Sequence, residues 1–475
     1  MNRLSIFTCA KKFKDALLLQ FANQSYSFNE LAAHCAPVCD HIHQIPEERT
    51  IVLKAHNHPS TVIIVLAAWH CRRKIALLHG KSTLAEKHQF KTKLADAYFI
   101  DDCSQFVQQS RASVFTGQSK TNARATAPGV LSQSESILFT SGSSGIAKGV
   151  ILPETTLAAA AMASETHLGW AKDDKWILNL PLAHVGGLSI LIRCLLAGKC
   201  AILHPRFDLP LIFDDIAMQG ASMISLVPTT LHRLMASDEW KRLRSLRVIL
   251  LGGAAASDTL RDQWQRRQLP VFETYGMTET ASQVATVPAS AITDATRPGL
   301  KPLQGVQVDI VDKNGVSMPA LTHGRIRILG PTVMRGYLGH PPVDGVFVSA
   351  DVGYLDENAY LHVLGRADDI IITGGENVYP ATVENSLKTV DGIREAVVFG
   401  VSDDEYGQLI AAALYVDTEI FSMDVLSASL EAHFPSHQKP RCVYIAPIQT
   451  IPLLENKKIH RARIIDAAVA HLIRV

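Results

Sequence analysis

Hydrophobic and polar positions alternate along the chain in blocks that fit strands followed by helices. The alternation is clearest in the middle of the chain, where short apolar runs at 222–227, 247–251 and 271–273 predict buried strands. Helical periods at 228–235 and 257–267 follow two of these runs. Successive strand–helix units of this kind predict parallel strands covered by helices, so we expect an α/β fold.

Other patterns in the first part of the chain predict local structure. Ser27 and Glu30 have the spacing of a capping box, so a helix is expected to begin there. The apolar run from Thr61 to Trp69 is about half of the roughly 20 residues that a membrane-spanning helix needs, and we interpret it as a buried helix. Residues 109–134 are polar and poorly periodic, which predicts an irregular connection, and residues 136–139 predict a strand.

The pattern changes twice in the second part of the chain. Residues 303–363 carry short strands separated by Gly, Asn, Asp and Pro, which predicts a β-rich subdomain. After Arg366 a new set of elements begins, and it predicts a small α+β domain. We expect helices at 380–389, 424–433 and 461–473, and strands near 394–401, 409–416 and 441–446. The prediction is therefore a large N-terminal domain, residues 1–367, and a small C-terminal domain, residues 368–475.

Composition narrows the class of protein. The chain has 475 residues, of which 47% are hydrophobic and 19% charged, and 46 basic residues balance 45 acidic ones. This balance argues against nucleic acid or a membrane surface as the main partner. The eight cysteines are scattered without a C-x-x-C pair, and the first residues lack the apolar core of a secretory signal. We expect a cytoplasmic protein with reduced thiols that acts on small molecules, with a homo-oligomer left open.

A loop of small residues follows the strand predicted at 136–139. It runs from Thr140 through Ser141, Gly142, Ser143, Ser144 and Gly145 to Lys148. Successive backbone N–H groups of such a loop can converge on phosphate oxygens, and the hydroxyls and the lysine add donors and positive charge. The spacing is not that of a Walker A motif. A flexible surface linker is the alternative, which the preceding apolar strand and the closing Lys148-Gly149 pair disfavour.

Three more motifs carry groups that suit a nucleotide. A turn of sequence Tyr-Gly-Met-Thr-Glu-Thr, residues 275–280, follows a buried strand, where ligands of α/β sheets usually bind. Asp351 can accept hydrogen bonds from a ribose diol, and Arg366 can donate to the nucleotide. The fourth motif is the basic stretch Asn456–Arg461. Taken singly, each has a plain structural explanation: a helix-start glutamate, a turn-capping aspartate and a solvated basic turn.

In this order and spacing, the four motifs resemble those of the acyl- and aryl-adenylate-forming superfamily, which includes acyl-CoA synthetases. The resemblance spans nearly the whole chain and implies the acetyl-CoA synthetase-like fold. It implies two steps: a carboxylate attacks the α-phosphate of ATP to give acyl-AMP and pyrophosphate, and the thiol of CoA then displaces AMP. ATP, Mg²⁺ and CoA are the implied cofactor and co-substrates. The N-terminal domain is then the adenylation domain, and the C-terminal domain is mobile.

The resemblance assigns roles to particular residues. Thr140–Lys148 would hold the β- and γ-phosphates, Thr278 would bond the α-phosphate, and Glu279 would bind Mg²⁺. Lys458 matches the lysine at the forming acyl-phosphate centre, although Lys457 stands where the family usually has glycine. The remaining nucleotide-binding residues that the resemblance implies are Gly253, Ala254, Thr274, Tyr275, Gly276, Asp351 and Arg366.

One stretch, residues 180–193, resembles the corresponding region of o-succinylbenzoate–CoA ligases, which serve menaquinone synthesis. It contains His184 and Gly187, and Arg193 follows His184 by nine residues. A dicarboxylic keto acid needs a cation, since one carboxylate reacts and the other must be recognised. We therefore expect His184, Gly187 and Arg193 to bind the acid, with His184 at the junction of carboxylate and CoA. The alternative for Arg193 is that it reaches solvent from the helix edge.

Motion of the C-terminal domain is a further implication of the resemblance. Lys458 serves the first step, whereas the loop that carries Gly374 and Gly375 would lie beside the thiol in the second. Both cannot face one site at once, so the domain would rotate about a hinge at Asp368.

Rival interpretations stay open at this point. His34, Cys35, Cys39, His41 and His43 could form a metal site, but Cys35 also belongs to an ordinary apolar helix stripe. A degenerate adenylate-binding sensor is disfavoured by the intact Thr140, Lys148, Glu279, Asp351 and Lys458. Another aryl- or acyl-CoA ligase, or an adenylation enzyme that loads a carrier protein, remains an alternative; no carrier domain follows Lys458, which favours free CoA.

Overall fold

The computed structural model describes residues 4–80, 92, 94, 96–115, 133–140, 148–288, 299–374, 376–403, 406–454 and 458–475. Within them, helices and strands alternate through the first 280 residues and strands dominate between residues 300 and 366. The helices are α1 (Ile6–Phe13), α2 (Phe28–Ile42), α3 (Pro59–His70), α5 (Cys103–Phe115), α6 (Glu154–Leu168), α7 (Val185–Ala197), α8 (Leu209–Met218), α9 (Pro228–Met235), α10 (Asp258–Arg266), α11 (Pro380–Leu387), α12 (Met423–His433) and α13 (Arg461–Val469).

A nine-stranded sheet carries the middle of the chain. Its order is β14-β13-β12-β11-β10-β8-β9-β1-β2, and the run from β12 to β1 is parallel. The strands are β1 (Leu17–Phe21), β2 (Gln24–Ser27), β8 (Lys175–Leu178), β9 (Cys200–Leu203), β10 (Met223–Leu226), β11 (Val248–Leu251), β12 (Val271–Met277), β13 (Ser282–Thr286) and β14 (Lys301–Pro302). The central strands are almost continuously apolar because both faces of a parallel sheet are covered.

A six-stranded sheet, of order β17-β7-β6-β4-β3-β5, lies beside the first. Its strands are β3 (Ile51–Ala55), β4 (Lys74–His79), β5 (Tyr98–Ile100), β6 (Glu135–Thr140), β7 (Lys148–Pro153) and β17 (Gly336–Tyr337). Helices α3 and α7 share one hydrophobic core with both sheets. Residues 59–69 of α3 are all buried, as expected of a helix that is apolar on every side.

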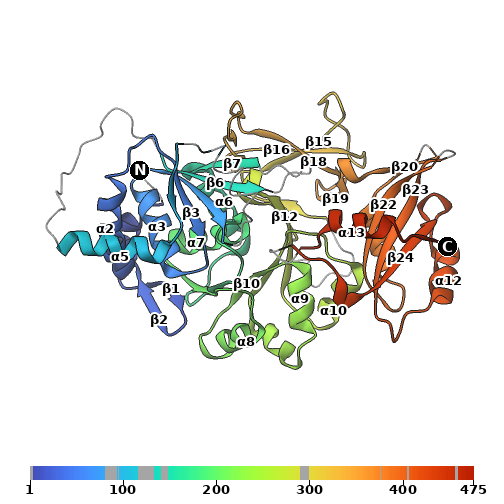
Figure 1. The fold of residues 1–475 in the computed structure, drawn as a ribbon, viewed down its shortest axis with the longest axis horizontal. Coiled ribbons are helices and arrows are strands. Elements are labelled where there is room, and N and C mark those ends of the chain that lie inside the picture. The colour runs from blue at the N-terminus through green and yellow to red at the C-terminus, as the bar shows by residue number, and fades with distance from the viewer. Residues whose placement is uncertain are drawn as a thin grey trace.

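The β-rich part forms a four-stranded sheet above the two larger ones in Figure 1. Its strands are β15 (Gln307–Val311), β16 (Gly324–Leu329), β18 (Val346–Leu355) and β19 (Leu361–Arg366). All its pairings are antiparallel, and it has a separate core.

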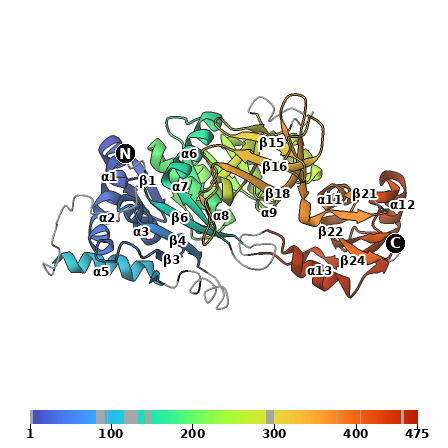
Figure 2. The same cartoon turned by 90° about the horizontal axis from the view of Figure 1, so that it is seen from above.

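The last hundred residues form a body at one end of the molecule (Figure 2). A four-stranded sheet of β22 (Ile393–Asp403), β23 (Gly407–Val416), β24 (Cys442–Pro447) and β25 (Ile473–Arg474) separates two cores. Helices α11 and α12 contribute to one core and α13 to the other. The short hairpin of β20 (Ile371–Thr373) and β21 (Glu376–Val378) precedes α11.

The predicted α/β class, with a β-rich part and a small α+β part, is confirmed, and the capping box of Ser27 and Glu30 begins α2 as predicted. The boundary between residues 367 and 368 stays a proposal. It falls within the short turn 367–369 that follows β19.

Three local predictions were wrong. Residues 109–115 continue helix α5, whose apolar residues Phe106 and Val107 pack against α2 and α3. Tyr275 and Gly276 do not form a turn, because β12 runs on to Met277 and pairs with β13. The final helix ends at Val469, and residues 473–474 add an edge strand to β24. In the described part of the chain, no helix is long and apolar enough to cross a membrane.

Candidate active site

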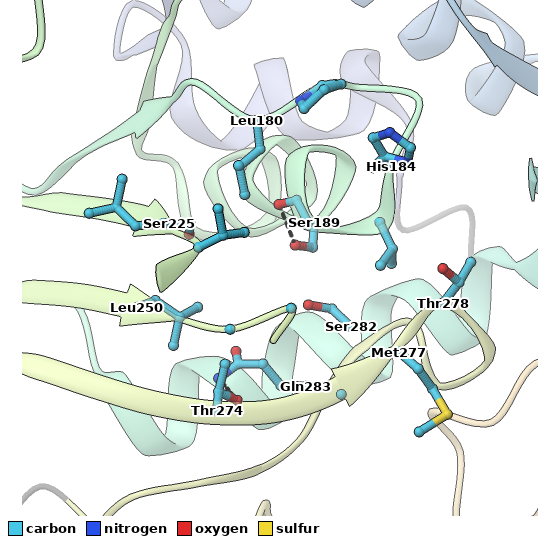
Figure 3. A pocket seen from close by; sticks show the side chains of 18 of the residues that line it. Leu180, His184, Ser189, Ser225, Leu250, Thr274, Met277, Thr278, Ser282 and Gln283 are labelled. Carbon is cyan, nitrogen blue, oxygen red and sulfur yellow. Dashed lines mark hydrogen bonds between the residues drawn. The ribbon is translucent and has the colours of Figure 1, made fainter. Parts of the chain in front are cut away.

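A cavity of about 280 Å³ opens at the carboxyl ends of the parallel strands β10, β11 and β12. Ligands of open α/β sheets bind at such strand ends, because the loops that follow the strands converge there. The start of α7 and the end of β6 form other parts of its wall. Figure 3 shows His184 and Leu180 on one side of the cavity and Thr274 and Gln283 on the other.

Arg193 brings a positive charge to the wall of this cavity. It lies in the middle of α7 and is only 4% exposed. Its Nη2 atom donates to Gln283 Oε1 at 2.9 Å and to Ser282 Oγ at 3.3 Å, whereas its buried Nε has no hydrogen-bond partner in the described ranges. No Asp or Glu of the described residues forms an ion pair with it. Burial lowers the pKa of Arg193 to about 10, so the guanidinium stays charged at neutral pH.

An aromatic ring supports this guanidinium. The Arg193 Cζ atom lies 5.2 Å from the ring centroid of Trp176, which is itself fully buried. The indole Nε1 donates to Ser225 Oγ at 3.1 Å, and Ser225 lines the cavity. A cation over an aromatic face is favourable, but it adds no negative charge. The site therefore holds a buried cation that is solvated only by neutral groups.

His184 is the residue before α7 and lines the same cavity. Burial, and then the electrostatic effects of the nearby His79 and Lys458 side chains, lower its pKa to about 4. The rings of His79 and His184 are 5.5 Å apart. The imidazole is therefore neutral at pH 7, where it can donate or accept one hydrogen bond without adding charge. Gly187, by contrast, is buried in the first turn of α7, against the carbonyl oxygens of Leu180 and Pro181, and does not line the cavity.

Lys458 reaches the cavity from the other end of the chain. A Cβ atom added to Gly253 would lie 3.0 Å from Lys458 Cε and 3.3 Å from Nζ, so a larger residue here would press against the end of this side chain. Gly253 also has φ +82°, which favours glycine. Burial lowers the pKa of the Lys458 amine. Lys457 lies outside the described residues.

A second group of predicted residues lies beside the cavity but does not line it. The Tyr275 hydroxyl donates to Asp351 Oδ2 at 2.6 Å, and Asp351 is paired with Arg366 across β18 and β19. Arg366 forms an exposed ion pair with Asp368 at 2.8 Å. Burial, followed by the charge of Asp351 and the hydrogen bond to it, raises the pKa of Tyr275 well above its usual range. Tyr275, Asp351 and Arg366 thus form a connected polar group.

The predicted metal and phosphate residues form a third group. Glu279 Oε1 accepts from the Tyr337 hydroxyl at 2.9 Å, and Lys148 Nζ lies 5.4 Å from the centroid of the same ring. Mg²⁺ commonly binds one or two carboxylates and takes its other ligands from phosphates and water. A single carboxylate beside a lysine fits that pattern. The described part of the chain has no cluster of three or more His, Cys, Asp or Glu side chains that could hold a metal alone.

The sequence prediction and the geometry overlap in part. The predicted residues that line the cavity are Thr140, His184, Arg193, Gly253, Thr274, Gly276, Thr278 and Lys458. Ala254 is exposed and does not line it, and Gly374 lies on the distant hairpin between β20 and β21. Ser141, Gly142, Ser143, Ser144, Gly145 and Gly375 lie outside the described residues.

Sequence reasoning missed Ser282, Gln283 and Trp176. Ser282 and Gln283 follow the 275–280 motif by two and three residues. Strand β13 has the sequence Ser-Gln-Val-Ala-Thr, without an alternation of apolar and polar positions, so its pattern gave no signal for either residue. Trp176 offered no such signal, because a tryptophan in a buried strand is common.

Comparison with known proteins gives a family. Residues 6–338 match the family model described as AMP-binding enzyme, and residues 382–458 match that of the AMP-binding enzyme C-terminal domain. The 2-succinylbenzoate–CoA ligase of Bacillus pumilus is 31% identical over 95% of both chains.

Two solved structures of o-succinylbenzoate CoA synthetase from Bacillus subtilis are also similar. One, in complex with the acyl-adenylate intermediate OSB-AMP, has a TM-score of 0.83 and 26% identity over 97% of both chains. The other, in complex with ATP and a magnesium ion, has a TM-score of 0.82 and 25% identity over 98% of this chain and 99% of that one. The predicted resemblance is confirmed.

The first testable prediction concerns the proton on His184. Because its pKa is depressed to about 4, the His184 imidazole should stay neutral in an NMR titration down to pH 5. Between its unfolded pKa of roughly 6.5 and about 4, the unfolded chain binds a proton that the folded chain does not, so this residue lowers stability as pH falls. Lys458→Met should raise the pKa, since a like charge is removed. An imidazole that titrates near 6.5 in the wild type would contradict the burial argument.

Proposed function

From the premise that this chain belongs to the AMP-binding enzyme family, we propose that it is an ATP-dependent 2-succinylbenzoate–CoA ligase. The observation that carries the proposal is Arg193, a buried cation that no carboxylate of the described residues pairs, in the wall of the cavity that Lys458 also lines. Fatty acids would have no use for that charge, whereas a dicarboxylic keto acid needs it. The names of similar proteins point to the same acid.

In the first step, an oxygen of the acid attacks the α-phosphorus of ATP. A new phosphorus–oxygen bond forms, the bond to the bridging oxygen breaks, and pyrophosphate leaves. Two anions must approach each other, so positive charge at the reacting centre lowers the barrier. Lys458, which reaches the cavity, supplies that charge in our proposal, and Thr278 donates to the α-phosphate. Mg²⁺, when bound at Glu279, neutralises phosphate charge.

The polar group beside the cavity would hold the nucleoside. Asp351 accepts from the ribose hydroxyls, with Arg366 as a second contact, and Tyr275 lies against the adenine. The hydrogen bond from Tyr275 to Asp351 supports this assignment, because it fixes the ring and the carboxylate relative to each other. Thr140 and Lys148 contact the β- and γ-phosphates together with the loop between them. The backbone at Gly253, Ala254, Thr274 and Gly276 completes this part of the site.

The second step uses the same acyl group but a different nucleophile. The sulfur of CoA attacks the carbonyl carbon of acyl-AMP, a carbon–sulfur bond forms, and AMP leaves. Lys458 stands at the cavity in this structure, which is the arrangement that the first step requires. We propose that residues 368–475 rotate about Asp368 before the second step, which would bring the hairpin of Gly374 and Gly375 to the thiol. Asp368 forms an exposed ion pair with Arg366, the second residue that we assign to the ribose, and this contact supports a hinge linked to the nucleotide site.

The compartment and pathway are also proposals. All eight cysteines lie in the described part of the chain, where no disulfide joins them, and six of them are buried, which fits the reducing cytoplasm. The product of the proposed reaction would serve menaquinone synthesis. Recovery of the protein outside the cytoplasmic fraction of its cells would contradict the assigned compartment.

The overall reaction is the direct test of the proposed function. With 2-succinylbenzoate, ATP, Mg²⁺ and CoA, the protein should release AMP and pyrophosphate and form a thioester, as measured by phosphorus NMR and mass spectrometry. Pantetheine-bearing carrier protein in place of CoA is the matched comparison. Release of ADP and phosphate would exclude the adenylate mechanism. Turnover of carrier protein but not CoA would favour a carrier-loading enzyme.

The next prediction concerns Arg193, to which we assign the recognition of the acid. Arg193→Ala should raise the KM for 2-succinylbenzoate about ten- to a hundred-fold, because a charge-assisted hydrogen bond is worth roughly 1.5–3 kcal/mol. The KM for ATP should stay near the wild-type value. An equal loss for both substrates would show that Arg193 supports the fold or the nucleotide instead.

Two variants separate the half-reactions. Lys458→Ala should abolish acyl-AMP formation but still convert supplied acyl-AMP and CoA to thioester. Asp368→Pro should do the reverse, because proline fixes φ and stiffens the hinge. Radiolabelled pyrophosphate exchange measures the first step, and thioester formation from supplied acyl-AMP measures the second. If both variants lose both steps equally, the rotation about Asp368 is wrong.

A further inference from the structure

Gln283 is the polar residue in closest hydrogen-bond contact with Arg193. It lies on β13, is 2% exposed, and its Oε1 atom accepts from Arg193 Nη2 at 2.9 Å. Figure 3 shows it beside Thr274, across the cavity from His184. Gln283 thus contacts Arg193 and also forms part of the cavity wall.

The neighbours of Gln283 fix which way its amide faces. Gln283 Nε2 donates to Thr286 Oγ1 at 3.0 Å and to Thr274 Oγ1 at 3.3 Å. Thr274 donates its own proton to the Ala285 carbonyl at 3.0 Å, so Thr286 donates in its 2.7 Å contact with Thr274. The Gln283 amide and the hydroxyls of Thr274 and Thr286 therefore all donate within this hydrogen-bond network. The amide nitrogen therefore faces the threonines, and the amide oxygen must face Arg193.

The backbone around the hairpin explains why this residue can sit there. A Cβ atom on Gly276 would lie 1.7 Å from the Ser282 carbonyl oxygen, so only glycine allows β13 to return this close to β12. The return brings Ser282 Oγ and Gln283 Oε1 to the same guanidinium nitrogen. The turn that follows the nucleotide motif thereby builds the acid pocket as well.

The chemistry of the amide has a consequence for charge. A buried guanidinium is normally matched by a carboxylate, because an unpaired buried ion costs several kcal/mol. Gln283 has the length and one acceptor oxygen of a glutamate, but no charge. It orients Arg193 and leaves the positive charge for another anion. Among the described residues, the buried Nε of Arg193 has no hydrogen-bond partner, so the protein does not saturate the donors of this guanidinium.

We propose that Gln283 is a specificity-determining residue, whose neutral amide holds Arg193 in place without neutralising it, so that the site selects acids with a second carboxylate. This inference rests on the proposed function and extends it, since it names the residue that keeps the cation available. Gln283 acts through Arg193 and is a positioning residue, not a catalytic one. Selection arises because a buried cation without its anion is costly, and only a dicarboxylate supplies the anion.

The test compares two replacements of similar size. Gln283→Glu can accept the same hydrogen bond from Arg193 but also neutralises it, whereas Gln283→Met keeps the charge and loses the hydrogen bond. We expect the KM for 2-succinylbenzoate to rise about a hundred-fold or more in Gln283→Glu and about three- to ten-fold in Gln283→Met. The KM for ATP should change less than about two-fold in both. Gln307→Glu, an exposed site on β15, adds the same charge elsewhere and should leave both KM values unchanged.

Two further measurements make the order of effects decisive. A monocarboxylate analogue that keeps only the reacting carboxylate should be used as poorly by Gln283→Glu as by the wild type, because the lost partner is absent from it. Without substrate, Gln283→Glu should melt at a higher temperature than Gln283→Met, because only the carboxylate restores a hydrogen-bond acceptor for Arg193.

Opposite results would overturn the inference. If the KM for 2-succinylbenzoate rises more in Gln283→Met than in Gln283→Glu, then Gln283 acts only through its packing and its hydrogen bond to Arg193. The neutrality of its side chain would then not matter. Equal losses for the dicarboxylate and the monocarboxylate would likewise exclude a role in selection. The wild-type protein distinguishes failure of the Gln283 inference from failure of the proposed function. If the wild type makes no 2-succinylbenzoyl thioester, the proposed function is wrong, whatever the variants do. The substrate-free melting order then still reports whether the introduced carboxylate pairs with Arg193.

Discussion

The burial of a guanidinium group without a protein anion is the interaction on which the acid end of this site depends. Arg193 sits in an apolar helix, against Trp176, and its hydrogen bonds within the described residues go only to neutral acceptors. A charge in this position costs free energy in the empty protein. The surrounding fold must be stable enough to offset that cost. Helix α7 is held in the main hydrophobic core, where it packs against strands β8, β9 and β13 of the nine-stranded sheet and against helices α1 and α6. In our proposal, the carboxylate of a bound acid pairs with Arg193, and the free energy that this pairing recovers strengthens the binding of the acid.

The rest of the site follows from where the sheet places its strand ends. Strands β10, β11 and β12 end at one edge, and their following loops supply the cavity wall that faces α7. The hairpin from β12 to β13 carries Thr278 and Glu279, to which we assign the phosphates and Mg²⁺, and also Ser282 and Gln283, which accept hydrogen bonds from Arg193. In our proposal, one short segment therefore serves both the acid and the nucleotide. Lys458 comes from the C-terminal part of the chain, and the end of its side chain packs against Gly253.

Much of the fold could be predicted from sequence, because it rests on local signals. Apolar runs gave the parallel strands, and the Ser27–Glu30 spacing gave the start of α2. The continuation of β12 through Tyr275 and Gly276 could not be read this way, because glycine usually signals a turn and here permits close approach of a neighbouring strand instead. Residues 109–115 were likewise too polar to reveal a helix that packs through only a few apolar side chains.

The site was predicted from motifs, and its connections came only from the structure. Arg193 and Lys458 could be named from sequence, where only the family resemblance related them to one site, and the structure shows that both line the same cavity. The burial of Arg193 was one of two open interpretations, and the structure supports burial over a path to solvent. Gln283 could not have been selected, since nothing in a single sequence says which neutral amide faces a buried charge.

The most direct measurement of this account is a crystal structure of the protein with a non-hydrolysable analogue of the 2-succinylbenzoyl adenylate. The account predicts that the carboxylate left free in the analogue lies within hydrogen-bond distance of the Arg193 guanidinium, with the Gln283 amide still bonded to Nη2. A free carboxylate that lies elsewhere, or an Arg193 side chain that has turned away from the cavity, would contradict the claim that this buried charge recognises the acid.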